Sequence, residues 1–312
     1  MFPKDNRVDF RAIEFFAGVG GFATAWPEVD VAAAIDIHQG AADVYAANCQ
    51  HPFWVREIQS IAVVELLALH ANLWWMSPPC QPYTLRGQRR DVADPRAKSL
   101  LRLIDLIAEC KPEFLLLENV RGFVTSLAFE YLTQQLDRCG YRWQTLELCP
   151  TVMSWPNKRP RFYLLASRGV DVAPWRDVPI YGAKTADLVA WQLDAQEVAS
   201  ELLMGESTIA SIVEGIDRCN PRSERATACF GSSYGRALLN SGSYLQLPDG
   251  GYRRFSPREV ANLLGFPLSF KFPITCRTQT LWKLLGNSLS LPAVRYILSH
   301  LPWGPSPKLP WR

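Results

Sequence analysis

Short apolar runs alternate with longer amphipathic segments through the N-terminal half of the chain. Two segments, 99–110 and 127–139, carry apolar residues at helical spacing, and they end next to Pro112 and Gly140. Six apolar runs have strand length: 11–16, 31–35, 73–76, 113–117, 143–148 and 161–166. The alternation predicts an α/β fold, in which helices cover both faces of a mostly parallel sheet.

The rhythm breaks between residues 169 and 279, where Gly, Ser and Pro interrupt every apolar run, and it resumes over 284–301. We therefore expect two domains. Residues 1–168 and 280–312 form the main domain, and residues 169–279 form a smaller lobe inserted before its last helix. The tail from 302 holds four prolines and is expected to be irregular.

Composition excludes several classes of protein. With 48% hydrophobic and 20% charged residues, the 312-residue chain is typical of a soluble globular protein and is not disordered or fibrous. Its most apolar stretch, 61–76, is interrupted by three polar residues and is shorter than the roughly 20 apolar residues of a membrane span. The first 11 residues include five charged ones, unlike a secretory signal. We expect a cytoplasmic protein, or a nuclear one in a eukaryote, with no membrane association.

Metal binding is not expected from the cysteines and histidines. The eight cysteines form no C-x-x-C pair, and only four histidines are present as co-ligands. Most cysteines are therefore expected to be reduced and buried. The net charge of +3 favours an anionic partner only slightly, and nothing in the sequence implies an oligomer.

Unusual residues follow the predicted strands, where an open parallel sheet binds its ligands. The first run leads into a glycine-rich turn at 16–21, and the second ends at Asp36. Such a turn lets a ligand approach the backbone, and the acid suits the hydroxyl groups of a ribose. The turn lacks both P-loop residues and dinucleotide spacing, which favours a nucleoside cofactor without a pyrophosphate. A simple tight turn and a helix-capping Asp36 are the alternatives.

The third and fourth runs lead to two reactive side chains. Prolines 78, 79 and 82 surround Cys80 and make the thiol difficult to bury, so a reactive thiolate is predicted, with a structural cysteine as the alternative. Glu118 ends an apolar run, where a charge is costly unless it is paired or catalytic.

Five motifs, in order along the chain, resemble the cytosine-5 methyltransferase family. They are Phe-Ala-Gly-Val-Gly-Gly at 16–21, Pro-Pro-Cys-Gln-Pro at 78–82, Glu-Asn-Val at 118–120, Arg-Pro-Arg at 159–161 and Leu-Gly-Asn-Ser at 285–288. Segments 82–84, 229–243 and 255–267 resemble the branch that methylates transfer RNA, often called DNA methyltransferase homologue two. The resemblance implies a Rossmann-like, S-adenosylmethionine-dependent sheet with an inserted target-recognition lobe.

The resemblance also implies the chemistry. Cys80 adds to carbon 6 of cytosine while Glu118 stabilises charge at ring N3, so that carbon 5 accepts the methyl group and S-adenosylhomocysteine is released. Arg159 and Arg161 are expected to position the base and the catalytic loop from one face of an extended segment, with Arg161 contacting the base. Two solvated surface arginines are the alternative.

A cofactor set follows from the same motifs. It comprises Phe16, Ala17, Gly18, Gly20, Gly21, Asp36, Ile37, Ile58, Pro78, Ser99, Asn287 and Ser288. Asn287 and Ser288 are expected to open the last helix and close the cofactor pocket, or to be a helix start only.

Nucleic-acid contacts are expected from a basic cluster after Cys80 and from the inserted lobe. The residues are Arg86, Arg89, Arg90, Lys98, Cys229, Phe230 and Tyr234. A solvated charged loop is the alternative for the cluster, and simple packing is favoured for Cys229.

The implied substrate is transfer RNA, at cytosine 38 in the anticodon loop of the aspartate species, where a looped base is cheap to flip. The alternatives are a DNA cytosine-5 methyltransferase of the restriction-modification type and a silent nucleic-acid-binding regulatory module. Two residues depart from the branch and bear on the RNA assignment. Gly231 stands where the branch has threonine, and Pro160 separates the two arginines.

Overall fold

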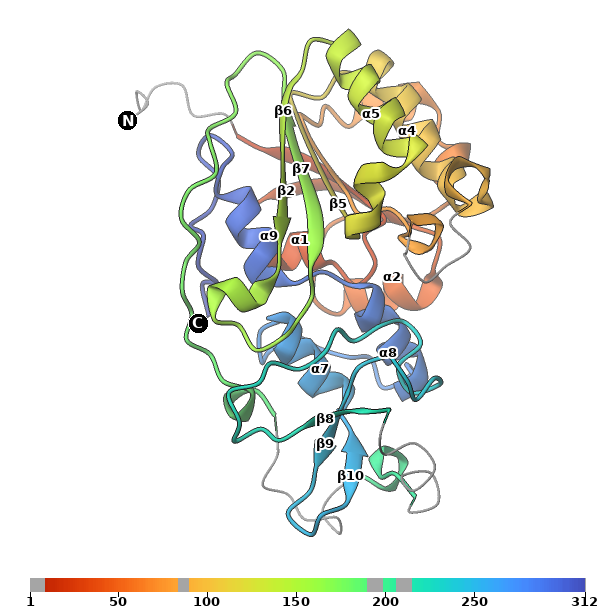
Figure 1. Ribbon diagram of the computed structural model, residues 1–312. Coiled ribbons are helices and arrows are strands. Elements are labelled where there is room, and N and C mark those ends of the chain that lie inside the picture. The colour runs from red at the N-terminus through yellow and green to blue at the C-terminus, as the bar shows by residue number, and fades with distance from the viewer. Residues whose placement is uncertain (1–8, 84–89, 190–198, 206–214, 312) are drawn as a thin grey trace. The chain divides into compact units, whose positions relative to one another are not determined.

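The computed structural model describes residues 9–83, 90–189, 199–205 and 215–311 (Figure 1). Contacts divide the chain into two compact units. The first unit comprises Met1–Leu148, Pro160–Asp177 and Arg295–Pro307, and the second comprises Cys149–Arg159, Val178–Val294 and Lys308–Arg312.

A seven-stranded sheet forms the centre of the first unit. Its strands are β1 (Arg11–Phe15), β2 (Asp30–Asp36), β3 (Phe53–Val55), β4 (Leu73–Met76), β5 (Phe114–Asn119), β6 (Arg142–Leu148) and β7 (Arg161–Ser167). The order is β3-β2-β1-β4-β5-β7-β6, with neighbouring strands parallel from β3 to β5 and β7 antiparallel to both of its neighbours. All six expected strands are present. The short edge strand β3 was not expected because its three residues are too few to show a pattern.

Helices cover both faces of this sheet, which confirms the α/β fold. They are α1 (Gly21–Ala25), α2 (Gln39–Ala46), α3 (Val63–Ala68), α4 (Lys98–Cys110) and α5 (Leu127–Arg138). Figure 1 shows α4 and α5 on one side of the sheet and α1 on the other. Strands β4 and β5 are buried along their whole length, as expected for central strands covered on two sides. Among the described residues, no helix is long and apolar enough to cross a membrane.

The second unit contains a three-stranded sheet in the order β10-β9-β8 and an aromatic core. Its elements are β8 (Asp217–Cys219), β9 (Ser243–Gln246), β10 (Tyr252–Arg254), α7 (Pro257–Leu264) and α8 (Thr278–Asn287). The rings of Phe230, Tyr234, Phe255 and Trp282 meet at centroid distances of 5.0 to 5.4 Å. Short 3-10 turns occur in both units. They lie at Ile58–Ser60, Gln81–Tyr83, Asp91–Ala93, Pro95–Ala97 and Arg121–Thr125 in the first unit, and at Pro150–Met153, Thr185–Asp187 and Ser200–Leu202 in the second.

The unit boundaries differ from the expected division at 168/169 and 279/280. Residues 149–159 and 280–294 belong to the second unit. The indole of Trp282 in α8 donates to the Phe255 carbonyl at 2.9 Å, so this helix packs within that unit. Helical spacing shows that a segment has an apolar face but not which core covers that face.

The start of the last helix is corrected as well. Asn287 is the final residue of α8, Ser288 follows it, and α9 (Leu291–Leu298) begins three residues later. Pro292 explains this boundary because proline suits the first turn of a helix and is unfavourable in its interior.

A close backbone approach in the second unit yields a test of the fold. A Cβ atom on Gly286 would lie 2.3 Å from the carbonyl carbon and oxygen of Gly231, whereas a Cβ atom on Gly231 would come no closer than 3.8 Å to any neighbour. Helix propensity favours alanine over glycine by about 1 kcal/mol. We expect the energetic cost of the clash to exceed this gain in helix propensity.

Gly286→Ala should therefore lower the free energy of unfolding by about 1–3 kcal/mol, and Gly231→Ala, the matched control, should change it by less than about 0.5 kcal/mol. Urea denaturation of both variants measures the difference. A Gly286→Ala protein as stable as the control would contradict the close approach.

Candidate active site

Four parallel strands of the first unit end at one edge of the sheet. In the register of the ladders, Phe15 pairs with Ile35 and Met76, and Met76 pairs with Leu117. The residues that follow these four positions are Phe16, Asp36, Ser77 and Glu118. The fold thus brings the glycine-rich turn, the acid, the cysteine loop and the second acid to neighbouring strand ends.

Asp36 holds the glycine-rich turn. Its two carboxylate oxygens accept hydrogen bonds from the backbone N–H groups of Gly18, at 2.9 Å, and His38, at 3.0 Å. Phe16, Gly18 and Gly20 have φ values of +58°, +53° and +84°, so the turn needs the left-handed conformation that glycine adopts easily. His38 is the N-cap of α2, so the helix-capping alternative for Asp36 is wrong.

The edge beside Asp36 fits a nucleoside. Each carboxylate oxygen accepts one backbone hydrogen bond and retains acceptor capacity for a ribose hydroxyl. The adjacent Ile37 is 66% exposed and offers an apolar surface beside this carboxylate.

The remaining residues of the expected cofactor set have varied environments. In the first unit, Ala17, Gly20, Gly21 and Pro78 are buried around the turn and the cysteine loop, and Ile58 lies in the main core. Ser99, in the first turn of α4, accepts a hydrogen bond from the Gln59 amide at 3.2 Å. In the second unit, the exposed Asn287 and the buried Ser288 follow one another at the end of α8.

A buried polar network lies beneath the glycine-rich turn, and sequence reasoning missed it. Glu14 in β1 is 1% exposed; one carboxyl oxygen accepts a hydrogen bond from the Phe22 N–H at 3.0 Å, and the other lies 3.4 Å from the Tyr45 hydroxyl. That hydroxyl is 3.2 Å from Nδ1 of His51. Desolvation raises the pKa of Glu14 to about 8, and burial lowers the pKa of His51. The one available signal was a charged residue inside an otherwise apolar strand.

Cys80 is half-buried on a loop that is fixed from two sides. The Asn119 amide, at the end of β5, donates to the Pro78 carbonyl at 3.3 Å, and the Ser77 hydroxyl donates to the Phe16 carbonyl at 3.3 Å. The Cys80 carbonyl accepts the first hydrogen bond of the following 3-10 turn. Asn119 therefore links the strand that carries Glu118 to the cysteine loop.

A cation lies near the thiol. The Arg96 guanidinium forms a 2.6 Å ion pair with Asp94 and is close enough to Cys80 for an electrostatic interaction that helps to raise the pKa of Arg96, after the larger effect of Asp94.

Glu118 and Arg161 form an ion pair on adjacent antiparallel strands. The distance from Nε to Oε1 is 3.1 Å, and the side chains are 13% exposed for Arg161 and 10% for Glu118. Both groups are largely removed from water, so each depends on the other for compensation. Arg161 therefore touches the candidate acid, and the solvated-surface alternative is wrong for it.

Arg159 has a different environment, within the second unit. It is 2% exposed, and its guanidinium donates to the carbonyls of Phe230, at 3.0 Å, Gly286, at 3.1 Å, and Ser288. The guanidinium also lies 3.4 Å from the half-buried Cys229 thiol. Arg159 thus joins two backbone segments more than 50 residues apart in sequence, and it too is not a solvated surface arginine.

The expected nucleic-acid contacts divide into three groups. Arg90 and Lys98 are exposed in the first unit, and Arg86 and Arg89 lie outside the described residues. Phe230 and Tyr234 are corrected, because at 0% and 1% exposure they are core residues of the second unit and their rings cannot reach a nucleic acid. Their aromatic character alone did not distinguish packing from stacking. Within the described part of the chain, no three His, Cys, Asp or Glu side chains are grouped to hold a metal ion.

Comparison with known proteins identifies the family. The model of the C-5 cytosine-specific DNA methylases matches residues 10–187 and 223–303. The chain belongs to this family. It is therefore a cytosine-5 methyltransferase, and its sheet, with helices on both faces, is the fold of the S-adenosylmethionine-dependent methyltransferases.

Two curated relatives and one solved structure illustrate the similarity. The tRNA (cytosine(38)-C(5))-methyltransferase of Schizosaccharomyces pombe is 30% identical, over 93% of this chain and 96% of the relative. The bovine (Bos taurus) enzyme of the same description is 27% identical, over 93% and 98%. The crystal structure of the S. pombe Dnmt2 methyltransferase aligns with a TM-score of 0.83 at 29% identity, covering 94% of this chain and 98% of that one.

The buried Glu14 carboxyl should make stability depend on pH. The folded protein retains this proton up to about pH 8, whereas an ordinary glutamate releases it near pH 4.5, so its contribution to stability falls as the pH rises between these values. Glu14→Gln keeps an acceptor for Phe22 and a polar group toward Tyr45 without the ionisation.

We expect the free energy of unfolding of the parent to fall by roughly 2–4 kcal/mol between pH 5 and pH 8 because of this carboxyl group. The Glu14→Gln variant should not show this fall. Urea denaturation at several pH values measures it, with the exposed Glu113→Gln as control. If parent and Glu14→Gln have parallel stability profiles, the carboxyl titrates normally.

The hydrogen bond from Asn119 to Pro78 should matter for the rate. Asn119→Ala frees the cysteine loop, and we expect kcat for methyl transfer to fall about tenfold, equivalent to about 1.4 kcal/mol of activation energy. Asn72→Ala is the matched control, because Asn72 bonds the backbone of Arg11 and Asp9 at the other end of the sheet. The control should lower the melting temperature without lowering kcat; equal kcat for the two variants would exclude the positioning role.

Proposed function

We propose that this protein methylates carbon 5 of a cytosine in transfer RNA, with S-adenosylmethionine as donor and a transient covalent bond between Cys80 and carbon 6. The observation that carries the proposal is the shared strand edge in the first unit, which holds the Cys80 loop, the Glu118–Arg161 pair and the Asp36 turn. In this proposal the first unit binds the cofactor, and the second unit recognises the target.

The residues present fit the cofactor. Asp36 would bind the ribose hydroxyls, Ile37 would cover the adenine, and the backbone at Gly18 and Gly20 would leave room for the amino-acid part. Bound there, S-adenosylmethionine supplies an electrophilic methyl group and leaves as S-adenosylhomocysteine. Asn287 and Ser288 are proposed as further contacts.

The protein's own groups prepare the base. The Cys80 thiolate adds to carbon 6 and breaks the 5,6 double bond. Glu118, in its carboxylic acid form, donates a hydrogen bond to ring N3 and stabilises the charge that develops on the ring, while Arg161 holds the carboxyl group in place. Carbon 5 then becomes enamine-like and nucleophilic. After methylation, a water molecule takes the carbon 5 proton, which restores the double bond and expels Cys80 as its thiolate. Both ring faces are used, so the cytosine must leave its stack.

Transfer RNA is favoured over DNA by the relatives, two of which are described as tRNA (cytosine(38)-C(5))-methyltransferases and align over nearly their whole length. We propose cytosine 38 of the aspartate species as the target, since an anticodon loop presents an unpaired base. The exposed Arg90 and Lys98 are proposed contacts to the RNA backbone, as are Arg86 and Arg89. The family model is that of DNA methylases, so DNA is the second candidate.

The test is transfer of labelled methyl from S-adenosylmethionine to small RNA and, side by side, to unmethylated DNA. We expect label in RNA, lost by at least about a thousandfold in Cys80→Ala and retained in the control Cys139→Ala, another half-buried cysteine of the first unit. Cytosine carrying fluorine at carbon 5 should trap a covalent RNA adduct with the parent only, because fluorine cannot leave as a proton.

Each other result has a definite meaning. Label in DNA alone would replace the RNA substrate by the second candidate. Full activity of Cys80→Ala would overturn the covalent mechanism, and absence of label in both nucleic acids with cofactor bound would indicate a silent regulatory module.

A further inference from the structure

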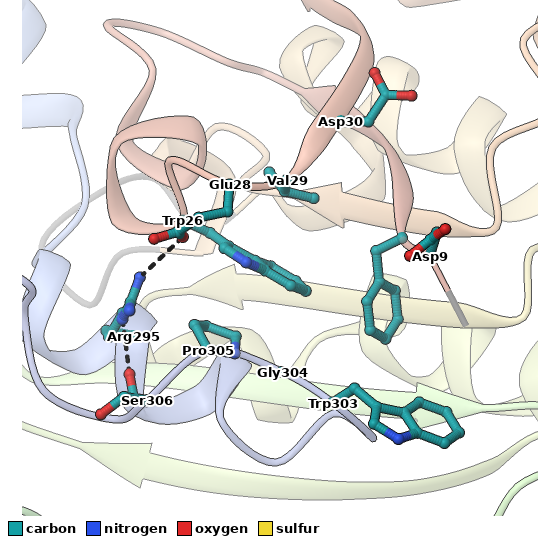
Figure 2. Close-up of a pocket in the computed structure, with 11 residues that line it drawn as sticks. Asp9, Trp26, Glu28, Val29, Asp30, Arg295, Trp303, Gly304, Pro305 and Ser306 are labelled. Carbon is teal, nitrogen blue, oxygen red and sulfur yellow. Dashed lines mark hydrogen bonds and ion pairs between the residues drawn. The ribbon is translucent and has the colours of Figure 1, made fainter. Parts of the chain in front are cut away.

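A cavity lies in the first unit, at the opposite edge of the sheet from Cys80. It has a volume of about 560 Å³, within the range of small-molecule sites (Figure 2). Asp9 and Phe10 precede β1, and Asp30 begins β2, so the cavity opens at the amino ends of the strands whose carboxyl ends form the candidate active site. The loop after α1 and the C-terminal segment 303–306 complete its lining.

Aromatic side chains form part of its wall. Phe10 and Trp26 pack edge to face at a centroid distance of 5.2 Å, and they are 8% and 7% exposed. Trp303, on the C-terminal segment, is half-buried in the same lining. Aromatic ring faces attract cations through their quadrupole, most strongly those of tryptophan.

The wall is fixed by the packing of the C-terminal segment. A Cβ atom on Gly304 would lie 2.1 Å from the Leu298 carbonyl, so the backbone of this segment rests directly on the end of α9. Arg295 holds the same segment, because its guanidinium donates at 2.7 Å to the carbonyls of both Ser306 and Ala25. The cavity is therefore bounded by elements that pack on the core.

The charge of the lining is negative. The lining includes three carboxylates, and Figure 2 shows that of Glu28 beside Trp26, that of Asp9 on the opposite side and that of Asp30 directed away from the Trp26 ring. Glu28 and Asp30 have side chains 66% and 55% exposed, and Asp30 is paired with Arg11. Among the lining residues the positive charge comes from Arg295, which is 4% exposed and bonded to the two carbonyls, with its guanidinium 3.8 Å from Glu28. An anion would meet the carboxylates of Asp9 and Glu28, whereas a cation would meet these carboxylates and aromatic side chains together.

We propose that this cavity binds an organic cation, an alkylammonium or guanidinium group. The aromatic wall accepts the apolar stem and the charge, and the exposed carboxylates supply the counter-charge. The same chemistry is carried by a free polyamine and by a lysine or arginine side chain of a partner polypeptide. Because the cavity lies at the other edge of the sheet, its occupant does not compete for the Asp36 turn, and the proposal is independent of the methylated substrate.

Isothermal titration calorimetry of the full chain tests both sources, with spermidine and with the peptide acetyl-Gly-Arg-Gly-amide as probes. We expect saturable one-to-one binding that weakens as salt is added. Glu28→Gln and Trp303→Leu should each weaken binding about three- to fivefold, and the exposed Glu109→Gln on α4 should not change it. Binding of one probe alone would support the cation site and identify its source.

A measurement on the unaltered protein makes the test independent of whether a variant folds. The peptide with citrulline in place of arginine has the same shape without the charge, and it should bind at least about tenfold more weakly. Equal binding of the two peptides, no binding of either cation, or equal weakening by Glu28→Gln and Glu109→Gln would overturn the proposal.

Discussion

The parallel register of β1, β2, β4 and β5 is the constraint on which the candidate active site depends. Because parallel strands all run in one direction, their carboxyl ends meet at one edge, and the residues that end or follow each strand are brought together there. Hydrogen bonds between the loops maintain this alignment. Ser77 reaches back to Phe16, and Asn119 reaches across to Pro78. The strand register and these hydrogen bonds therefore determine where the residues of the candidate active site lie.

Three carboxyl groups lie at or under this edge, and the structure compensates each in a different way. Asp36 is half-exposed and accepts two backbone N–H groups. Glu118 is buried and paired with a guanidinium, which leaves both charges compensated. Glu14 is deeper still, has no cation within its network, and avoids the desolvation penalty by holding its proton. The carboxyl group therefore has three roles here: it anchors a turn in Asp36, it is a candidate catalytic group in Glu118, and it is a neutral hydrogen-bonding group in Glu14.

Much of this was predictable from the sequence, for local reasons. Strand β4 and the first four residues of β5 are uninterrupted apolar runs, and Cys80 and Glu118 stand out because each comes after such a run. The features that were missed depend on partners far along the chain. The carbonyls that bind Arg159 lie 71 to 129 residues away, so its sequence neighbours do not show that the guanidinium is buried among them. In the sequence, Phe230 and Tyr234 resemble residues that stack on bases. In the structure, Phe255 packs against Phe230 and Trp282 packs against Tyr234 in the core.

The division of the chain constrains how the protein is made. Both units are discontinuous, and segments of each come from the last 18 residues. Strands β1 to β7 leave the ribosome early, but Arg295, which fastens the C-terminal segment beside α1, is synthesised more than a hundred residues after β7. At about 5–20 residues per second, the first unit waits several seconds or more with an unfinished surface. Each unit therefore depends on a segment synthesised after most of its core, since residues 295–307 belong to the first unit and residues 308–312 to the second.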